Sequence, residues 1–232
     1  MTEMGALVWC VPTSRPARLT LNERRQRMLA LSVLVDGILK ARVATDGLHV
    51  LTVYVSGSKA SDEIATVELH GGSHPESGNA TFLIWLSEAL HPAQCVRVEV
   101  ATEGANSHPG KTVEDWFSEL PGEERESVPS CEQLTHDAGP HGHHRDRLAL
   151  VVHSSSGTHV STEVKPDEHG FSASFDWNWV KPERVSASLS TYTPDQLLSK
   201  KGSNRHFKEL LRPGEWAEIR IDSWTKPLAA VR

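Results

Sequence analysis

The chain has 232 residues, of which 38% are hydrophobic, and a formal net charge of −6. This length suits one large domain or two small ones. The acidic charge argues against general nucleic-acid binding and allows a basic protein as a partner. Three widely spaced cysteines fit neither a disulfide framework nor a paired-cysteine zinc site. No signal peptide is evident, and no apolar run is long enough to span a membrane, so we expect a cytoplasmic location.

In chain order, residues 1–30 form an N-terminal segment of undefined role. Three runs of alternating apolar residues then predict strands: 31–35, 49–55 and 64–69. Apolar residues three or four positions apart predict a short helix over 80–90: Phe82, Trp85, Leu86 and Ala89. A strand over 95–100 closes this first unit, which spans residues 31–110.

Residues 111–147 differ in composition from the rest of the chain. They are acidic, contain several glycines and prolines, and end in a group of histidines. Apart from Trp116-Phe117 and Leu120, they lack apolar periodicity. We therefore predict a linker or long loop between two folded units.

The second unit, residues 148–232, repeats the order of the first. Alternation predicts four strands: 148–152, 171–177, 185–189 and 216–221. Thr193 is the expected cap of a helical turn that starts at Pro194, and a second helical stretch is expected over 205–211.

The two units match in sequence pattern as well as in order. Three segments of the first align with three of the second: Leu31–Val35 with Leu148–Val152, Ala65–Leu69 with Val185–Leu189, and Leu90–Val100 with Leu211–Ile221. The last match extends backward, with Leu86, Glu88 and Ala89 opposite Phe207, Glu209 and Leu210. Such repeats define the architecture of a chain. We therefore predict a β-rich α+β fold made of two tandem copies of a strand-strand-strand-helix-strand unit, packed together.

The closing motif of each unit supports a resemblance. Leu90–Val100 and Leu211–Ile221 resemble the end of a small β-rich unit in uncharacterised bacterial proteins, in which Gly-Asp often precedes the last strand. Here these positions are Ala93-Gln94 and Gly214-Glu215. The resemblance implies a bacterial source and an architecture, and it brings no catalytic residues.

A group of histidines at the end of the linker is a candidate metal site: His136, His141, His143 and His144. Imidazole groups bind zinc and nickel well. The sequence lacks the fixed spacing of a catalytic metal site, so we expect no functional cofactor here. The alternative hypothesis is a metal-dependent enzyme that uses the histidines from His136 to His153.

The segment Asp176-Trp-Asn-Trp179 contains two tryptophans at strand spacing. Trp177 and Trp179 could therefore lie on one face, where they would form either a core pair or a surface that grips a protein or a sugar. A glycan-binding module that uses both rings is a further alternative.

No nucleophile elbow or phosphate-binding loop is present, so we predict no catalytic residues. Our first hypothesis is a non-enzymatic protein that binds another protein, as an immunity protein neutralises a toxin. The expected binding residues are aromatic or acidic: Trp116, Trp177, Trp179, Glu114, Asp115 and Glu119. We expect no contact with nucleic acid or membrane, and dimerisation through an exposed edge strand is left open.

Overall fold

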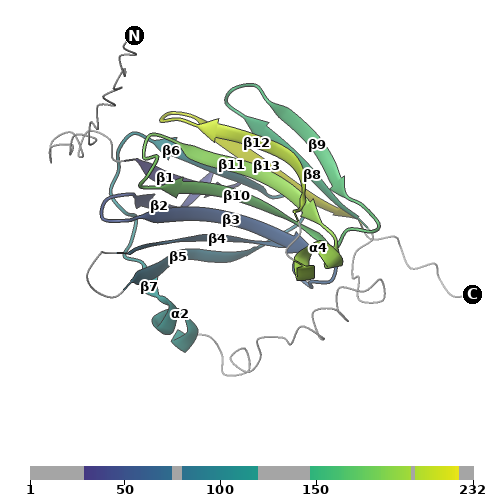
Figure 1. The fold of residues 1–232 in the computed structure, drawn as a ribbon, viewed down its shortest axis with the longest axis horizontal. Helices are drawn as coiled ribbons and strands as arrows, with labels where there is room; N and C mark the ends of the chain where they lie inside the picture. Colours follow the sequence, from purple (N-terminus) through teal and green to yellow (C-terminus); the bar gives the residue numbers. More distant parts are fainter. Residues whose placement is uncertain (1–28, 75–79, 120–146, 200–201, 225–232) are drawn as a thin grey trace, which may run out of the picture.

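The computed structural model describes residues 29–74, 80–119, 147–199 and 202–224. Two antiparallel β-sheets pack face to face, and apolar side chains from both form one core (Figure 1). The predicted α+β class is wrong, because the described chain is almost entirely β and has only two short helices.

The six-stranded sheet has the order β2-β1-β6-β13-β8-β9. Its strands are β1 (Ala30–Val35), β2 (Ile38–Ala44), β6 (Cys95–Ala101), β8 (Arg147–Ser154), β9 (His159–Val164) and β13 (Trp216–Trp224). The first and second halves of the chain therefore meet inside this sheet, where β6 pairs with β13.

The seven-stranded sheet has the order β12-β11-β10-β3-β4-β5-β7. Its strands are β3 (Val50–Ser58), β4 (Ala65–Ser73), β5 (Thr81–Leu90), β7 (Lys111–Thr112), β10 (Gly170–Asn178), β11 (Val185–Tyr192) and β12 (Asn204–Leu211). Here the halves meet through β3 and β10. The units predicted at 31–110 and 148–232 therefore contribute strands to the same two sheets.

The helices are α2 (Val113–Glu119) and α4 (Pro194–Ser199). Thr193 caps α4 as predicted, since its Oγ1 accepts a hydrogen bond from the Gln196 amide at 3.2 Å. Neither helix has the length and apolar character that crossing a membrane requires, and the described residues include no other candidate.

Both longer helices predicted from the sequence are wrong, because residues 80–90 and 205–211 lie in β5 and β12. Each strand contains a β-bulge. The β4 partners of Leu86 and Ile84 are consecutive residues, so Trp85 is an extra residue in β5. His206 is likewise extra between Arg205 and Phe207 in β12. An extra residue shifts the alternation by one position, which produces the three- and four-residue spacing that resembles a helix.

The strand pairing gives a correspondence between the first half (residues 30–101) and the second half (residues 147–224). The bulges in β5 and β12 lie opposite equivalent points of their partner strands, directly after Leu69 in β4 and Leu189 in β11. Leu31 faces Val100 just as Leu150 faces Ile221, so Leu31 corresponds to Leu150 and not to Leu148 as predicted. In the β6–β13 pair, Arg97 faces Glu218 at 3.0 Å. A common origin of the halves stays a prediction.

Candidate functional site

The two tryptophans of β10 and its following turn have different environments. Trp177 is 4% exposed and donates from Nε1 to the Pro182 carbonyl at 3.1 Å. Trp179 is 60% exposed and meets the His49 ring edge-on at 5.3 Å between centroids. The pair therefore does not form a two-ring platform, and only Trp179 is open to a ligand.

The predicted acidic binding residues lie on α2, beside β5. Thr112 caps this helix: its Oγ1 accepts from the Asp115 amide at 3.1 Å and donates to the Asp115 carboxylate at 2.9 Å. Glu114 and Asp115 are exposed, and the Lys111 ammonium lies 5.6 Å from the Trp116 ring centroid. Glu119 is the last residue of α2. This helix presents two carboxylates to solvent.

The predicted metal ligands His136, His141, His143 and His144 lie outside the described residues. His153 is exposed on β8, and its Nδ1 is 3.0 Å from Nδ1 of His159 on β9. Within the described ranges, no group of three or more histidine, cysteine or acidic side chains could hold a metal ion.

The outer face of the seven-stranded sheet carries short hydroxyl side chains around one carboxylate. Ser174 donates to Asp176 at 2.8 Å, and Thr52 donates to its other oxygen at 3.1 Å. Ser186 and Ser188 continue the hydroxyl side chains on β11. The outer face of the other sheet instead has ion pairs such as Arg97–Glu218 and Arg220–Asp222. Short side chains allow closer contact with another molecule than long, hydrated charged side chains do.

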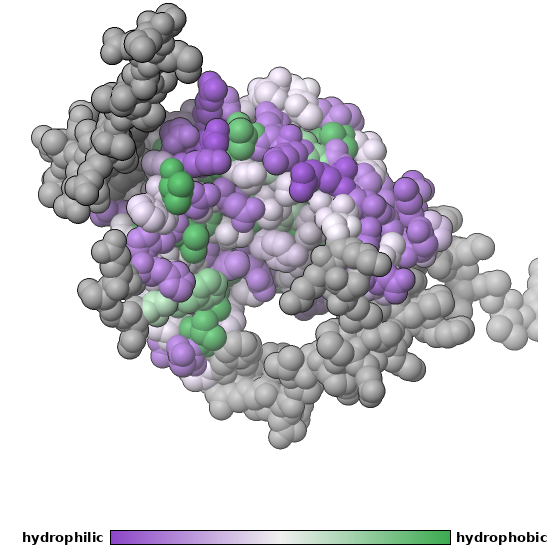
Figure 2. Space-filling model, in the orientation of Figure 1, coloured by the Kyte–Doolittle hydropathy of each residue, from purple (hydrophilic) through white to green (hydrophobic). Residues whose placement is uncertain are grey.

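Exposed hydrophobic side chains lie at one end of the seven-stranded sheet. Val50 faces both Asn178 and Gly72, and Gly72 faces Phe82, so these positions form one row across β10, β3, β4 and β5. Trp179 and Val180 follow Asn178 at the same end of the sheet, and Val180 is 68% exposed. Trp179 has the strand parity of the inward-facing Trp177, so it lies on the side of the sheet opposite to Val50. Figure 2 shows hydrophobic side chains along one margin of this view, among polar neighbours. We call Val50, Phe82, Trp179 and Val180 the apolar row.

His70 lies next to the apolar row. Its ring meets Phe82 edge-on at 5.3 Å, and its Nε2 is buried without a hydrogen-bond partner among the described residues. Burial lowers the pKa of His70 below its usual value, although the carboxylates of Glu68 and Asp176 act in the opposite direction. The His70 ring adds to the aromatic character of this end of the sheet.

A hollow of about 300 Å³ lies beside the turn that follows Trp179 and Val180. It is lined by Glu183, Arg184, Glu209, Leu210, Arg212 and Glu215. Glu209 faces Ala187 across the sheet, on the same side as the buried Phe207 and Leu211. Its Oε2 atom is buried and has no hydrogen-bond partner within the described part of the chain.

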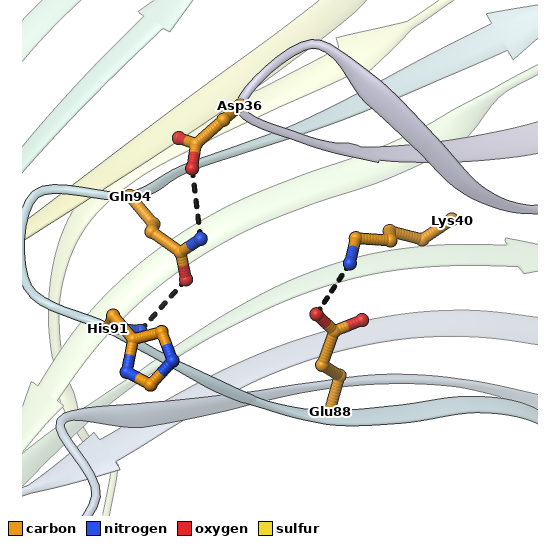
Figure 3. Close-up of polar contacts among 5 residues, drawn as sticks. All are labelled: Asp36, Lys40, Glu88, His91 and Gln94. Atoms are coloured by element: carbon orange, nitrogen blue, oxygen red, sulfur yellow. Dashed lines mark hydrogen bonds and ion pairs between the residues drawn. The ribbon is translucent and has the colours of Figure 1, made fainter.

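At the corresponding position the first half has an ion pair, which Figure 3 shows. Glu88 faces Val67 as Glu209 faces Ala187, and the Lys40 ammonium lies 2.6 Å from its Oε1. Lys40 extends from β2, so this ion pair joins the two sheets. Each half thus has a glutamate at the same strand position. Glu88 forms an ion pair with Lys40, whereas the Oε2 atom of Glu209 has no hydrogen-bond partner among the described residues.

The turns beside the two glutamates also correspond. The His91 amide donates to Gln94 Oε1 at 2.8 Å, and the Arg212 amide donates to Glu215 Oε2 at 2.7 Å. Gln94 also donates to Asp36 at 2.9 Å (Figure 3). The same backbone frame therefore surrounds both glutamates.

A second polar cluster connects β9 with β12. Glu168 accepts hydrogen bonds from Thr191 at 2.6 Å and from Asn204 at 2.6 Å. Because the Thr191 hydroxyl donates to Glu168, it must accept from His206 Nε2, 2.8 Å away. The Thr162 hydroxyl lies 3.3 Å from Nδ1 of the same ring. These groups use their hydrogen bonds within the cluster, which indicates a structural role at the edge of the sandwich.

The charge of Glu168 follows from these bonds. Burial alone would raise the pKa of this carboxyl group, but hydrogen bonds from Thr191, the Lys165 amide and Asn204 hold the pKa below its ordinary value. Nearby, the buried Lys59 donates to the carbonyls of Lys165 and Pro166 at 2.7 and 3.3 Å. Both contacts fix the loop between β9 and β10.

Sequence reasoning found Trp179 but missed the rest of the apolar row and the hollow. Phe82 was assigned to the buried face of a helix, and Val50 to an ordinary strand. Val180 had a usable signal, since it lies between Trp179 and Lys181-Pro182, where a turn would expose it. The sequence match sets Glu209 opposite Glu88, but the environment of Glu209 depends on strands far away in the sequence.

Comparisons of the chain with known protein families, with curated proteins and with solved structures find no match. The functional interpretation therefore depends on the geometry of this chain alone.

Proposed function

We propose that the protein binds another protein through the end of the seven-stranded sheet that carries the apolar row. The observation that carries this proposal is that four exposed hydrophobic side chains lie at this one end of the sheet: Val50, Phe82, Trp179 and Val180. Tryptophan and phenylalanine are enriched at protein interfaces, and a buried tryptophan often contributes most of the binding energy. The short hydroxyl side chains beside the apolar row allow a partner to pack closely against the sheet.

The charge of the chain favours a basic partner. The net charge is −6, and α2 exposes Glu114 and Asp115 beside the same sheet. Opposite charges accelerate association even when they add little affinity. Neutralisation of a basic toxin in the cytoplasm is one form that this function would take, and the free thiol of Cys95 suits a reducing compartment.

The test begins with native mass spectrometry of complexes isolated gently from the source cells, which identifies a candidate partner. The affinity of that purified partner is then measured for the wild type, Trp179→Ala and Phe82→Ala. We expect Trp179→Ala to weaken binding about thirtyfold or more, since hot-spot truncations cost about 2 kcal/mol or more. Ile38→Ala is the matched control, because Ile38 is 66% exposed but lies on the other sheet.

The control variant should bind within about twofold of the wild type. Unchanged affinity of both Trp179→Ala and Phe82→Ala would remove the apolar row from the interface. Charge reversal of Glu114 and Asp115 should slow association at low salt and leave dissociation nearly unchanged. An unaltered association rate would exclude α2 from the steering surface.

A further inference from the structure

The two glutamates at corresponding positions show what kind of group the hollow lacks. Glu88 and Glu209 both lie two residues before the buried leucine that ends their strand, Leu90 in β5 and Leu211 in β12. Both lie on the inward side of the seven-stranded sheet, at its border with the other sheet. The local frame is therefore the same, and only the partner differs.

The partner of Glu88 depends on a bulge in β2. Val33 and Leu34 of β1 face Ala41 and Leu39, so Lys40 is an extra residue that is free to turn toward Glu88. The corresponding pair, β8 and β9, has no such shift: Val152 faces Val160, and His153 faces His159. The second half therefore lacks the extra residue that would supply an ammonium group.

The Oε2 atom of Glu209 is buried and accepts no hydrogen bond from the described residues. A buried carboxylate oxygen without a partner destabilises the protein, so a group that donates to it gains binding energy. Neither arginine at the hollow fills this role, since Arg184 lies 3.7 Å from Glu183 and Arg212 is exposed. Glu215 already accepts from the Arg212 amide.

The hollow also continues the surface of the proposed function. Trp179 and Val180 enter the turn between β10 and β11, and Glu183 and Arg184 at the end of this turn line the hollow. Two contacts hold the turn in place: the Lys181 amide donates to Asn178 Oδ1 at 3.1 Å, and Trp177 donates to the Pro182 carbonyl. A partner that covers Trp179 therefore lies close to Glu209.

We propose that the hollow beside Glu209 receives a primary ammonium group, supplied by a lysine side chain of the protein partner. This inference rests on the proposed function for the identity of the partner, but its chemistry comes from the pairing of Lys40 with Glu88. The incoming ammonium takes the position relative to Glu209 that the Lys40 Nζ atom takes relative to Glu88. The methylene groups of the lysine would pack along Leu210, which is 46% exposed.

The test uses a small probe, so that it does not require the partner. The full chain, labelled with ¹⁵N, is titrated with N-acetyl-lysine-N-methylamide and followed by the amide signals of residues 183–184 and 209–212. The control probe is N-acetyl-norleucine-N-methylamide, which has the same aliphatic chain but no ammonium group. We expect saturable shifts with the lysine probe only, and at least tenfold weaker binding for Glu209→Gln.

Two variants of the first half make the test reciprocal. Lys40→Ala should open the corresponding position, so that the lysine probe also shifts the amides around Glu88. Glu88→Gln alone should leave binding at Glu209 unchanged. Equal shifts with both probes, or unchanged binding by Glu209→Gln, would overturn the proposal, since the carboxylate would then have no role.

The outcomes also separate this inference from the proposed function. If Trp179→Ala abolishes partner binding while the lysine probe never binds, the interface stands and the assignment of the hollow fails. If the probe binds as expected but Trp179→Ala leaves the affinity for the identified partner unchanged, the hollow binds ammonium groups and the proposed interface is wrong.

Discussion

The two bulged strands of the seven-stranded sheet accommodate their extra residues differently, one with an apolar side chain and the other with a polar one. Trp85 and His206 are the extra residues of β5 and β12, at corresponding points of the two halves. Trp85 is 5% exposed and fills the core, whereas His206 is half-buried between two threonine hydroxyl groups. One bulge is thus stabilised by apolar contact and the other by a chain of hydrogen bonds.

The surroundings of each bulge match its extra residue. Beside Trp85, a Cβ atom added to Gly110 would lie 2.8 Å from the indole ring, so only glycine lets the chain pass this closely. Beside His206, Thr191 transmits the hydrogen bonding to the carboxylate of Glu168. The bulged backbone therefore accommodates either an apolar or a polar extra residue. Local stability is expected to depend on pH only where the bulge is connected to an ionisable side chain.

The largest effect is expected at the apolar bulge. Trp85→Ala removes a buried indole and leaves a cavity, so the free energy of unfolding should fall by about 3–5 kcal/mol. His206→Ala should lose less, about 1–3 kcal/mol, because it mainly leaves hydroxyl groups without a partner. Urea denaturation of both variants measures the difference. A larger loss for His206→Ala would reverse this view of the two bulges.

The polar bulge should show its own pH dependence. The pKa of Glu168 is lowered in the folded protein, so its contribution is present above the ordinary value of 4.5 and is lost as pH falls through the folded pKa. Glu168→Gln should cost about 2 kcal/mol at neutral pH, and the gap to the wild type should narrow below about pH 4. Denaturant titrations across pH would show this, and a constant gap would contradict it.

A smaller effect is expected at the ion pair between the sheets. Lys40 and Glu88 have side chains that are 30% and 34% exposed, so solvent screens their attraction. Lys40→Met should therefore lower the free energy of unfolding by about 1 kcal/mol or less. The loss should shrink further in high salt, when thermal unfolding is measured over a salt series. A salt-independent loss would indicate packing of the lysine chain instead.

Small effects of opposite sign are expected at the turns before β6 and β13. Ala93 has φ of 69° and Gly214, at the corresponding position, has φ of 86°. Because alanine is strained in this region, Gly214→Ala should destabilise by about 1–2 kcal/mol at most. Ala93→Gly should stabilise by less than about 1 kcal/mol, since glycine loses more entropy on folding. Melting temperatures that shift in the same direction for both variants would contradict this reasoning.

Strands with strict alternation could be predicted from the sequence, and those with bulges could not. Leu51, Val53 and Val55 alternate without interruption, and β3 was found close to its observed bounds. In β5 and β12, one extra residue was enough to suggest helices. β2 and β9 were missed, because alternation in these edge strands is diluted by residues such as Lys40 and Glu163.

The candidate site was predictable only where a single residue carries it. The sequence points to Trp177 and Trp179 together, because they have strand spacing. Nothing in the sequence distinguishes the exposed Trp179 from the buried Trp177. The apolar row needs the register of four strands, and the hollow needs a comparison between Glu209 and Glu88. Both the apolar row and the hollow depend on which distant strands pair, and this pairing cannot be read from neighbouring residues in the sequence.

The pairing of Arg97 with Glu218 has a consequence for how the halves recognise each other. Arg97 and Glu218 occupy corresponding positions, and they face each other where β6 meets β13. If two copies of one half paired in the same way, arginine would face arginine, or glutamate would face glutamate, and like charges would repel. Joined in one chain, the halves place opposite charges together. The protein thereby discriminates against self-assembly of either half, although both halves use the same backbone arrangement.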